Sequence, residues 1–594
     1  MMDHVDHLNI EIYDVEVFKE DWMVTFQNVR SGEYTVIHND NYALKNFMDQ
    51  DDLILGGFNS KFYDNWIIQA ILLGADNRMV KEINDYIIDG GLGWEHHFLQ
   101  YKKRTFKAFD LRDDLPMNLS LKAIEGNLGL DIVETGVPFD IDRKLTDEEV
   151  RSTIEYNKVD VNSTVNLFHL RKDYLQGKMT VAKIKGFDEV DALGLTNAKL
   201  TAKYLDAKRV ERNDEREYVI PPQVNQDRIP QDILDFFAQM ADESISDDDL
   251  FNSSLKIEIE GVEYVYGFGG VHGAKANYFS DGKKLILNWD VTSLYPNLMI
   301  LFDYVSRNVP NPKLFADVVA RRIKAKNEGD KMVSDALKLV INTCYGAMLN
   351  KWNDLYDPRQ VRGVCITGQL LLSDLTFGLM EACESFETIN FNTDGIMFAI
   401  DMQDLPKAYE VKEEWEQRTK LELEEDMINA VYQKDVNNYI IENLDGSITT
   451  KGGYVANYKA RDTGKIINNS LTVIHNAIVE YFVHGVEVEE TIQKTENILD
   501  FQNIVKTGWT YTHTIHEVGD DEVTVQKVNR VYASPDSKYG TIRKIKADGR
   551  SDKIANTPMK TIVDNGNHLT IDEIDKQWYI NLAKKRIKQY KGEK

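Results

Sequence analysis

The stretch LILNWDVTSLYPNLM, residues 285–299, places a carboxylate where it could hold a metal ion. Its apolar lead predicts a buried strand that ends at Asp290. Pro296 lacks an N–H group and biases Tyr295 towards an extended conformation, so we expect the chain to break there. A carboxylate beside free amides suits a cation with a polyphosphate, because the acid binds the cation and the amides bind phosphate oxygens. For this residue taken alone, an ordinary Asp at a strand end is the alternative.

Further acids in the N-terminal part have a spacing that could bind metal. Asp14 and Glu16 are two residues apart on a predicted strand, so both side chains point to one face. The two carboxylates repel each other unless a cation lies between them. For a single pair of this kind, however, the usual explanation is that both side chains lie on a solvent-exposed face of the strand. Asp64 follows an apolar strand at a predicted helix start, and Tyr156 and Asp160 share one face of a later helix.

Residues 314–350 predict two helices separated by the turn NEGD, because apolar positions recur at helical spacing on both sides of it. Lys338, Asn342 and Tyr345 fall at i, i+4 and i+7, on one face of the second helix. This stripe could equally be the solvated side of an ordinary amphipathic helix.

Residues 386–400, FETINFNTDGIMFAI, predict a hairpin of two strands joined by a two-residue turn at Asp394-Gly395. A glycine-rich segment, YGFGGVHG, occupies residues 266–273 and could be a plain turn. Lys451 and Tyr454 lie further along, in TTKGGYVANYKARD.

The elements that must position these residues belong to a chain of several domains, since 594 residues exceed one core. A net charge of −27 argues against a nucleic-acid-binding protein that is basic over its whole surface. The last 54 residues are nevertheless basic, since they hold 13 Lys and Arg against 7 Asp and Glu. Three scattered cysteines indicate neither a zinc site nor disulfides, which fits a reducing, cytoplasmic location. The first residues lack the apolar core of a signal peptide, and we expect no membrane-spanning segment.

The N-terminal motifs resemble those of the exonuclease domain of proofreading polymerases. The segment DVE at residues 14–16 is similar to the first exonuclease motif, NSKFYD at 59–64 to the second and YNKVD at 156–160 to the third. The resemblance implies that Asn59 touches the single-stranded 3′ end and that Tyr156 orients the attacking water. It implies metal binding by four acids: Asp14, Glu16, Asp64 and Asp160.

The later motifs resemble family B DNA polymerases. DVTSLYP matches the first polymerase motif, DxxSLYP, and KLVINTCYG at residues 338–346 matches KxxxNxxYG. The resemblance implies that Asp290 is a catalytic metal ligand and that Tyr295 lies against the sugar of the incoming nucleotide. It implies that Lys338 meets the triphosphate and that Tyr345 packs against the nascent base pair. The remaining nucleotide-binding residues that it implies are Ser293, Leu294, Asn342 and, as a basic pair on the facing helix, Arg322 and Lys326.

Three segments depart from the family pattern. In the third polymerase motif, YxDTDS, Asn392 stands where the first acid is usual and Gly395 replaces Ser, while Asp394 is kept as the second metal-binding acid. The glycine-rich segment resembles YxGG with one extra residue. The segment with Lys451 and Tyr454 resembles the KxY element that grips primer-template DNA, with a spacing of three rather than two.

The resemblance covers roughly residues 8–460 and implies an α/β multidomain protein with an RNase H-like exonuclease and a right-hand polymerase. The palm would hold an antiparallel sheet, the fingers would be short and helical, and a thumb would follow. We assign 1–175 to the exonuclease, 176–284 to a linker and the start of the polymerase region, 285–312 and 353–460 to the palm, 313–352 to the fingers, and 461–594 to a DNA-gripping thumb.

The expected activity is primer-dependent DNA synthesis from dNTPs with 3′→5′ proofreading, using two Mg²⁺ per active site, or Mn²⁺ in their place. About 104 residues separate Asp290 from Asp394, which leaves room for short fingers only, so we expect a phage or mobile-element enzyme in the host cytoplasm. Its partners would be primer-template DNA, dNTPs, single-stranded DNA at the exonuclease site and replisome proteins. Two alternatives remain: a catalytically inactive polymerase-like scaffold, and a DNA nuclease with a polymerase-derived binding region.

Overall fold

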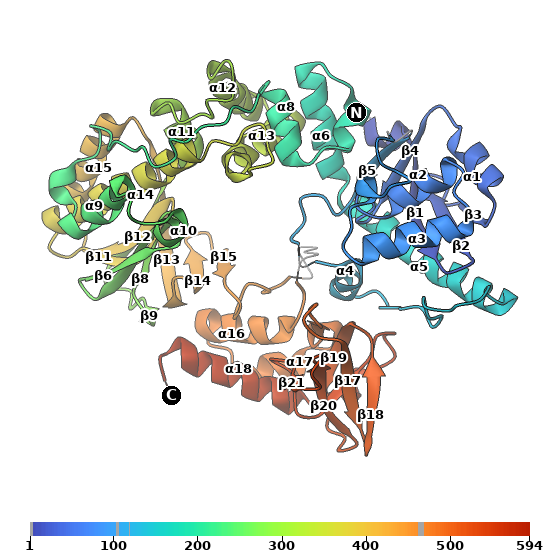
Figure 1. Cartoon of the computed structure of the whole chain (residues 1–594). Coiled ribbons are helices and arrows are strands. Elements are labelled where there is room, and N and C mark those ends of the chain that lie inside the picture. Colours follow the sequence, from blue (N-terminus) through green and yellow to red (C-terminus); the bar gives the residue numbers. More distant parts are fainter. Residues whose placement is uncertain (1–3, 103–105, 118, 461–467, 594) are drawn as a thin grey trace.

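The computed structural model describes residues 4–102, 106–117, 119–460 and 468–593. It is a mixed α/β protein with several sheets, as expected from the sequence. Figure 1 shows its parts arranged in a ring, with the N-terminal sheet on the right, the largest sheet on the left and the C-terminal part below. Helices α6, α8, α12 and α13 join the two sheets across the top.

The N-terminal part is built on a five-stranded sheet of order β3-β2-β1-β4-β5. The first three strands are antiparallel, and β1 pairs in parallel with β4, as β4 does with β5. Helix α5 packs against β1 and β2, and it begins with the capping box of Thr146 and Glu149. The elements are β1 (Asn9–Val17), β2 (Trp22–Asn28), β3 (Tyr34–His38), α1 (Asn41–Met48), β4 (Leu53–Gly57), α2 (Asp64–Leu72), α3 (Asn77–Ile88), β5 (Lys107–Asp110), α4 (Leu121–Leu128) and α5 (Asp147–Leu170).

A connecting group of helices follows and leads into the middle of the chain. Helices α6 and α8 pack against α13, so residues that follow the N-terminal sheet support an element more than 100 positions later. The helices are α6 (Lys172–Lys185), α7 (Glu189–Leu193), α8 (Asn197–Tyr204), α9 (Gln231–Ala238) and α10 (Asp247–Phe251).

The largest sheet has ten strands in the order β15-β14-β13-β10-β12-β11-β8-β7-β6, with β9 paired to β13. Helix α14 lies at the centre of the largest apolar core. The strands are β6 (Ser254–Ile259), β7 (Val262–Gly267), β8 (Gly270–Ala274), β9 (Tyr278–Phe279), β10 (Leu285–Val291), β11 (Glu387–Asn392), β12 (Gly395–Ile400), β13 (Leu423–Asp435), β14 (Asn438–Asn443) and β15 (Ile448–Lys451). The helices are α11 (Leu294–Leu301), α12 (Lys313–Asn327), α13 (Lys331–Leu349), α14 (Pro358–Ala382) and α15 (Leu405–Thr419).

Helix α14 bears on the expectation that the chain has no membrane-spanning segment. Among the described residues, it is the helix long and apolar enough to cross a membrane by length and composition, with 25 residues and a mean hydropathy of 1.4. However, 94% of its apolar window is buried inside the protein, as in the core helix of a globular domain.

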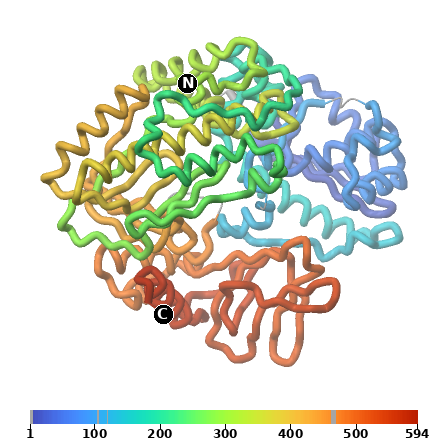
Figure 2. Tube along the Cα trace, turned by 60° about the vertical axis from the view of Figure 1, so that its left-hand side comes forward, coloured from blue at the N-terminus to red at the C-terminus, as the bar shows by residue number. Residues whose placement is uncertain are grey.

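The C-terminal part packs two small sheets, β16-β19-β22 and β18-β17-β20-β21, beside three helices. Figure 2 shows it next to the N-terminal part. Its elements are α16 (Thr472–His484), α17 (Val488–Lys494), β16 (Asn503–Lys506), β17 (His513–Val518), β18 (Asp521–Val525), β19 (Val528–Ala533), β20 (Tyr539–Ile545), β21 (Ser551–Lys553), β22 (Thr561–Val563) and α18 (Lys576–Tyr590).

Buried polar contacts join the N-terminal and C-terminal parts. Arg530 on β19 is fully buried, and its guanidinium donates to the carbonyl oxygen of Leu130 at 2.6 Å and to Gln502 Oε1 at 2.9 Å. Asn469 forms two further hydrogen bonds with Asn127, at 2.9 and 2.6 Å. Because unmatched buried polar groups are costly, these contacts hold the two parts in one arrangement.

Candidate active sites

Four carboxylates from three elements meet beside the N-terminal sheet. Oxygens of Asp14 and Glu16, both on β1, and of Asp160 on α5 lie within 4.8 Å of one another. Asp64, the first residue of α2, accepts a hydrogen bond at 3.2 Å from the backbone N–H of Val15, between the two β1 acids. The structure therefore brings together all four acids that the sequence suggested.

The electrostatics of this cluster call for a cation. Burial, together with the neighbouring acids, raises the pKa of Asp14 well above its ordinary value and that of Glu16 to about 8. Burial likewise raises the pKa of Asp64 to about 7 and also raises that of Asp160. A buried group of oxygen donors with this much repulsion fits hard divalent cations such as Mg²⁺ or Mn²⁺.

Lys122 on α4 is a member of this site that the sequence analysis did not identify. Its ammonium group donates hydrogen bonds to Asp160 and, at 3.4 Å, to Glu125 Oε1. It also lies 5.0 Å from the centre of the Tyr156 ring. Burial acts to lower the pKa of Lys122, but Asp160 and Glu125 outweigh it and raise the pKa. Lys122 thus supplies one internal positive charge beside four acids.

Tyr156 and Asn59 border the cluster differently. Tyr156 lies one helical turn before Asp160, and burial followed by the Asp160 charge raises the pKa of its phenol. Asn59 has a left-handed backbone with φ of 63°, and its side-chain oxygen accepts a hydrogen bond from Arg112 at 2.8 Å. The amide oxygen of Asn59 is thus engaged by a cationic side chain.

A second pair of acids lies on the ten-stranded sheet. Asp290 on β10 is paired across strands with Gly395 on β12, and the N–H of Val291 donates to the carbonyl oxygen of Asp394 at 2.8 Å. Asn288 donates to Asp290 Oδ2 at 2.6 Å. Burial, then the nearby Asp394 charge, raises the pKa of Asp290 to about 6. Asp290 and Asp394, the two acids predicted to bind metal, therefore lie close together where β10 ends and β12 begins.

The hairpin that carries Asp394 forms as expected, but its turn is one residue earlier. Asn392 pairs with Gly395, so the turn residues are Thr393 and Asp394 rather than Asp394-Gly395. Gly395 is the first residue of β12, where an added Cβ would lie 1.9 Å from Asp290 Oδ1 and 2.7 Å from the carbonyl oxygen of Trp289. The close approach of Asp290 thus explains the glycine at this position.

The expected chain break at Pro296 is wrong. Helix α11 already begins at Leu294, after Ser293 in a left-handed conformation with φ of 47°. Pro296 occupies the first helical turn, where its missing N–H would have no intrahelical partner, and Tyr295 is helical rather than extended. The expectation of free amides after Asp290 is met in another form, since the first turn of a helix presents unpaired N–H groups.

A cavity of about 450 Å³ opens between α11, α13 and the Thr393-Asp394 turn. The rings of Tyr295 and Tyr345 meet in it with their centres 4.4 Å apart. It brings together several predicted nucleotide-binding residues and Asp394, since its walls include Ser293, Leu294, Tyr295, Asn342, Tyr345, Gly346 and Asp394. An adjoining cavity of about 290 Å³ is lined by Asp290, Asn392 and, again, Asp394.

The three basic residues predicted to bind the nucleotide do not line the larger cavity. Lys338 lies on α13, on the same exposed face as Asn342 but about one turn further from Tyr345. Arg322 and Lys326 lie on α12, the antiparallel neighbour of α13. The predicted helix pair is confirmed, with a break between Asn327 and Lys331.

The predicted DNA contacts beyond the sheet have partners within the protein. The Lys451 ammonium lies 5.6 Å from the ring centre of Tyr439, a wall residue of the smaller cavity. Tyr454 donates its hydroxyl to Gln589 at 2.8 Å and packs edge-on against Tyr590, both on α18. Tyr454 therefore joins the sheet to the C-terminal helix. The glycine-rich segment 266–273 forms the β7–β8 hairpin, in which Gly267 pairs with Gly270.

Comparisons with known proteins find similarity among solved structures only. No protein-family model matches the chain, and no curated protein matches it. Among solved structures, the chain is similar to the family B DNA polymerase from the hyperthermophilic archaeon Pyrobaculum calidifontis, with 13% sequence identity and a TM-score of 0.38. The match covers 98% of this chain and 78% of that chain.

Proposed function

We propose that this protein is a DNA polymerase that extends a primer 3′-OH with dNTPs and removes nucleotides with a separate 3′→5′ exonuclease site. The observation that carries the proposal is a pair of acids, Asp290 and Asp394, beside a cavity of nucleotide size. A separate cluster of four acids elsewhere in the chain supports the second activity. An inactive scaffold would need neither group of acids, and a simple nuclease would need only one of them.

At the synthesis site, Asp290 and Asp394 would hold two Mg²⁺, or Mn²⁺ in their place. Bound there, the metals would lower the pKa of the primer hydroxyl and stabilise the charge that develops on the phosphate oxygens. The first-turn N–H groups of α11 suit the phosphate oxygens of the incoming nucleotide. Tyr295 and Tyr345 offer ring faces to the sugar and base, and Lys338, Arg322 and Lys326 would supply positive charge as the triphosphate enters.

At the exonuclease site, Asp14, Glu16, Asp64 and Asp160 would hold two metals that generate the attacking hydroxide and stabilise the leaving oxygen. Tyr156, on α5 beside the cluster, would orient the water, and Lys122 would offset part of the acid charge. The sheet order β3-β2-β1-β4-β5, with α5 across it, supports an RNase H-like assignment for this part. The ten-stranded antiparallel sheet supports a palm, α12 and α13 short fingers, and the basic C-terminal part a thumb.

Primer extension on a labelled primer-template tests the proposal. Asp290→Ala and Asp394→Ala should each abolish extension while single-strand degradation continues, because the two acid clusters are separate. Asp281→Ala, which removes an exposed acid just before β10, is the matched control and should extend normally. Extension near the wild-type rate in either site variant, or no extension by the wild-type protein with Mg²⁺ or Mn²⁺, would refute the assignment.

A further inference from the structure

A second surface with unusual chemistry lies at the far end of α13. A pocket of about 480 Å³ opens between α8 and the loop that follows α13. Its walls include the side chains of Lys199, Lys203 and Lys208 and the indole of Trp352. Trp352 is 81% exposed, so its indole is open to contact with another molecule.

The charge of this pocket is locally opposite to that of the whole chain. Within the described part of the chain, no ion pair involves Lys199, Lys203, Lys208 or the neighbouring Lys351, whose ammonium lies 5.2 Å from the Trp352 ring centre. Of the two wall acids, Asp206 is already paired with Lys185 at 2.6 Å. The Lys203 ammonium also lies 4.1 Å from the ring centre of Phe187. In a protein of net charge −27, lysines without carboxylate partners beside an exposed indole suit an anionic, planar partner.

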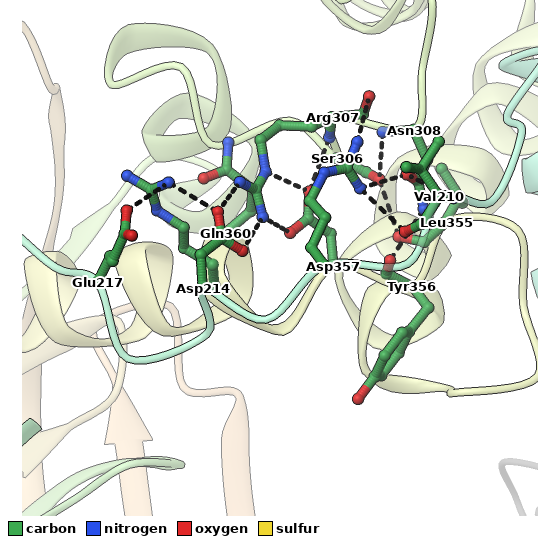
Figure 3. A network of polar contacts seen from close by, with 12 residues as sticks. Val210, Asp214, Glu217, Ser306, Arg307, Asn308, Leu355, Tyr356, Asp357 and Gln360 are labelled. Atoms are coloured by element: carbon green, nitrogen blue, oxygen red, sulfur yellow. Dashed lines mark hydrogen bonds and ion pairs between the residues drawn. The ribbon is translucent and has the colours of Figure 1, made fainter. Parts of the chain in front are cut away.

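The pocket is held in place by a buried polar network, part of which Figure 3 shows. Asn308 is 3% exposed and donates to the carbonyl oxygens of Asp354 and Tyr356, both at 2.9 Å. Its own carbonyl oxygen accepts the N–H of Lys208 at 2.9 Å. One buried residue therefore ties the backbone at Lys208 to the loop that carries Trp352, so the two walls are held in a fixed arrangement.

The position of the pocket relates it to the synthesis site. Tyr345 lines the nucleotide-sized cavity, and Trp352 follows seven residues later, just beyond the end of α13 at Leu349. Four of these seven steps lie on α13 and rise about 6 Å along its axis, and the last three lie in the loop after the helix. The helix that walls the cavity therefore leads directly into the loop that carries the indole.

We propose that this pocket binds the single-stranded template ahead of the synthesis site, with a base stacked on Trp352 and phosphates on the lysines. Stacking on aromatic rings combined with a basic groove is how proteins hold single strands without reading their sequence. The identity of the strand as the template rests on the proposed function, whereas binding of single-stranded DNA at the pocket does not.

Binding of labelled DNA, measured by fluorescence anisotropy in EDTA so that no reaction occurs, tests this assignment. The probes are a primer-template with a 10-nucleotide thymidine overhang and the corresponding blunt duplex. Trp352→Ala should weaken binding of the overhang substrate about tenfold and leave the blunt duplex unchanged, because the loss of one stacked base lies in the range of about 5- to 150-fold. Trp352→Phe should retain most of the affinity.

The lysines have a separate readout. Lys199→Ala with Lys203→Ala should reduce the slope of log affinity against log salt for the overhang substrate by up to about 1.4, since each phosphate contact on a single strand contributes about 0.7. Lys256→Ala with Lys283→Ala removes the same charge from ion-paired positions and should leave the slope unchanged.

Three outcomes separate this inference from the proposed function. Equal affinity of wild type and Trp352→Ala for the overhang substrate would overturn the inference even if the protein extends primers. Loss of affinity for blunt duplex and overhang alike would also overturn it. A selective loss with the overhang would support single-strand binding at the pocket even in a protein that shows no extension.

Discussion

Gly395→Ala adds one methyl group at the point where β12 pairs with β10, beside Asp290. The new Cβ would lie 1.9 Å from Asp290 Oδ1 and 2.7 Å from the carbonyl oxygen of Trp289, whereas ordinary contact begins at 3.4 Å. The carboxylate can rotate away, but the carbonyl belongs to a paired strand, so the backbone must move by about 0.7 Å. Both movements displace Asp290 from the position that faces Asp394.

The expected effect is larger on synthesis than on folding. Overpacking of this kind typically costs about 1–3 kcal/mol of stability, which a protein with this much buried core can tolerate. Misplacement of a reacting group by about 1 Å costs on the order of 100-fold in rate. We therefore expect Gly395→Ala to fold and to extend primers about 100-fold more slowly than wild type.

Single-turnover primer extension at saturating dNTP, beside a melting curve, measures this effect. Exonuclease activity on single-stranded DNA is the internal control, because its proposed acids lie beside a different sheet. Gly177→Ala is the matched variant, since a Cβ there meets nothing within 4 Å. A folded Gly395→Ala protein that extends within threefold of wild type would refute the reasoning.

Three further predictions concern the two sites. Asp14→Ala combined with Glu16→Ala should remove Mg²⁺-dependent 3′ degradation and leave extension intact; residual degradation by the purified protein would contradict it. Tyr295→Ala should raise ribonucleotide insertion by about 100-fold or more and Tyr295→Phe should change it little, because exclusion of a 2′-hydroxyl depends on ring volume; unchanged sugar preference in a folded Ala variant would contradict this. The raised pKa of Glu16, about 8 against an ordinary 4.5, means that metal-free protein loses stability as pH rises through this interval. Glu16→Gln should therefore melt higher than wild type in EDTA at pH 8 but not at pH 5, and equal melting temperatures at pH 8 would count against it.

Much of the local structure could be predicted from the sequence, because it depends on short-range patterns. The hairpin carrying Asp394 follows from two apolar runs around a polar turn, and the pair α12 and α13 follows from helical periodicity. The meeting of Asp14 and Glu16 on one face follows from the two-residue period of a strand. These patterns also placed Asp64 at a helix start and Asp290 near a strand end, as the structure has them.

The errors arose where tertiary packing decides the outcome. Pro296 was expected to break the chain, yet at the third position of α11 its missing N–H has no cost. Lys122 has no distinctive local pattern, since its partner Asp160 is 38 residues away and meets it only after α4 and α5 pack together. Similarly, the turn of the hairpin lies one residue earlier than expected because Gly395 already pairs with its neighbours. This register depends on how closely β10 and β12 approach.

Arg530 has a consequence for any attempt to divide this chain. Its buried guanidinium relies on carbonyl oxygens of the segment after α4 for part of its hydrogen bonding, so removal of the first 135 residues would expose a cation and strip it of those acceptors. A shortened chain would then be less stable although no residue of its own had changed. Replacing Arg530 with a smaller neutral residue would not repair the loss, since Gln502 and Asn567 also depend on it. The two proposed activities should therefore be separable by point substitution but not by dissection, and evolution could lose one of them without discarding the part that carries it.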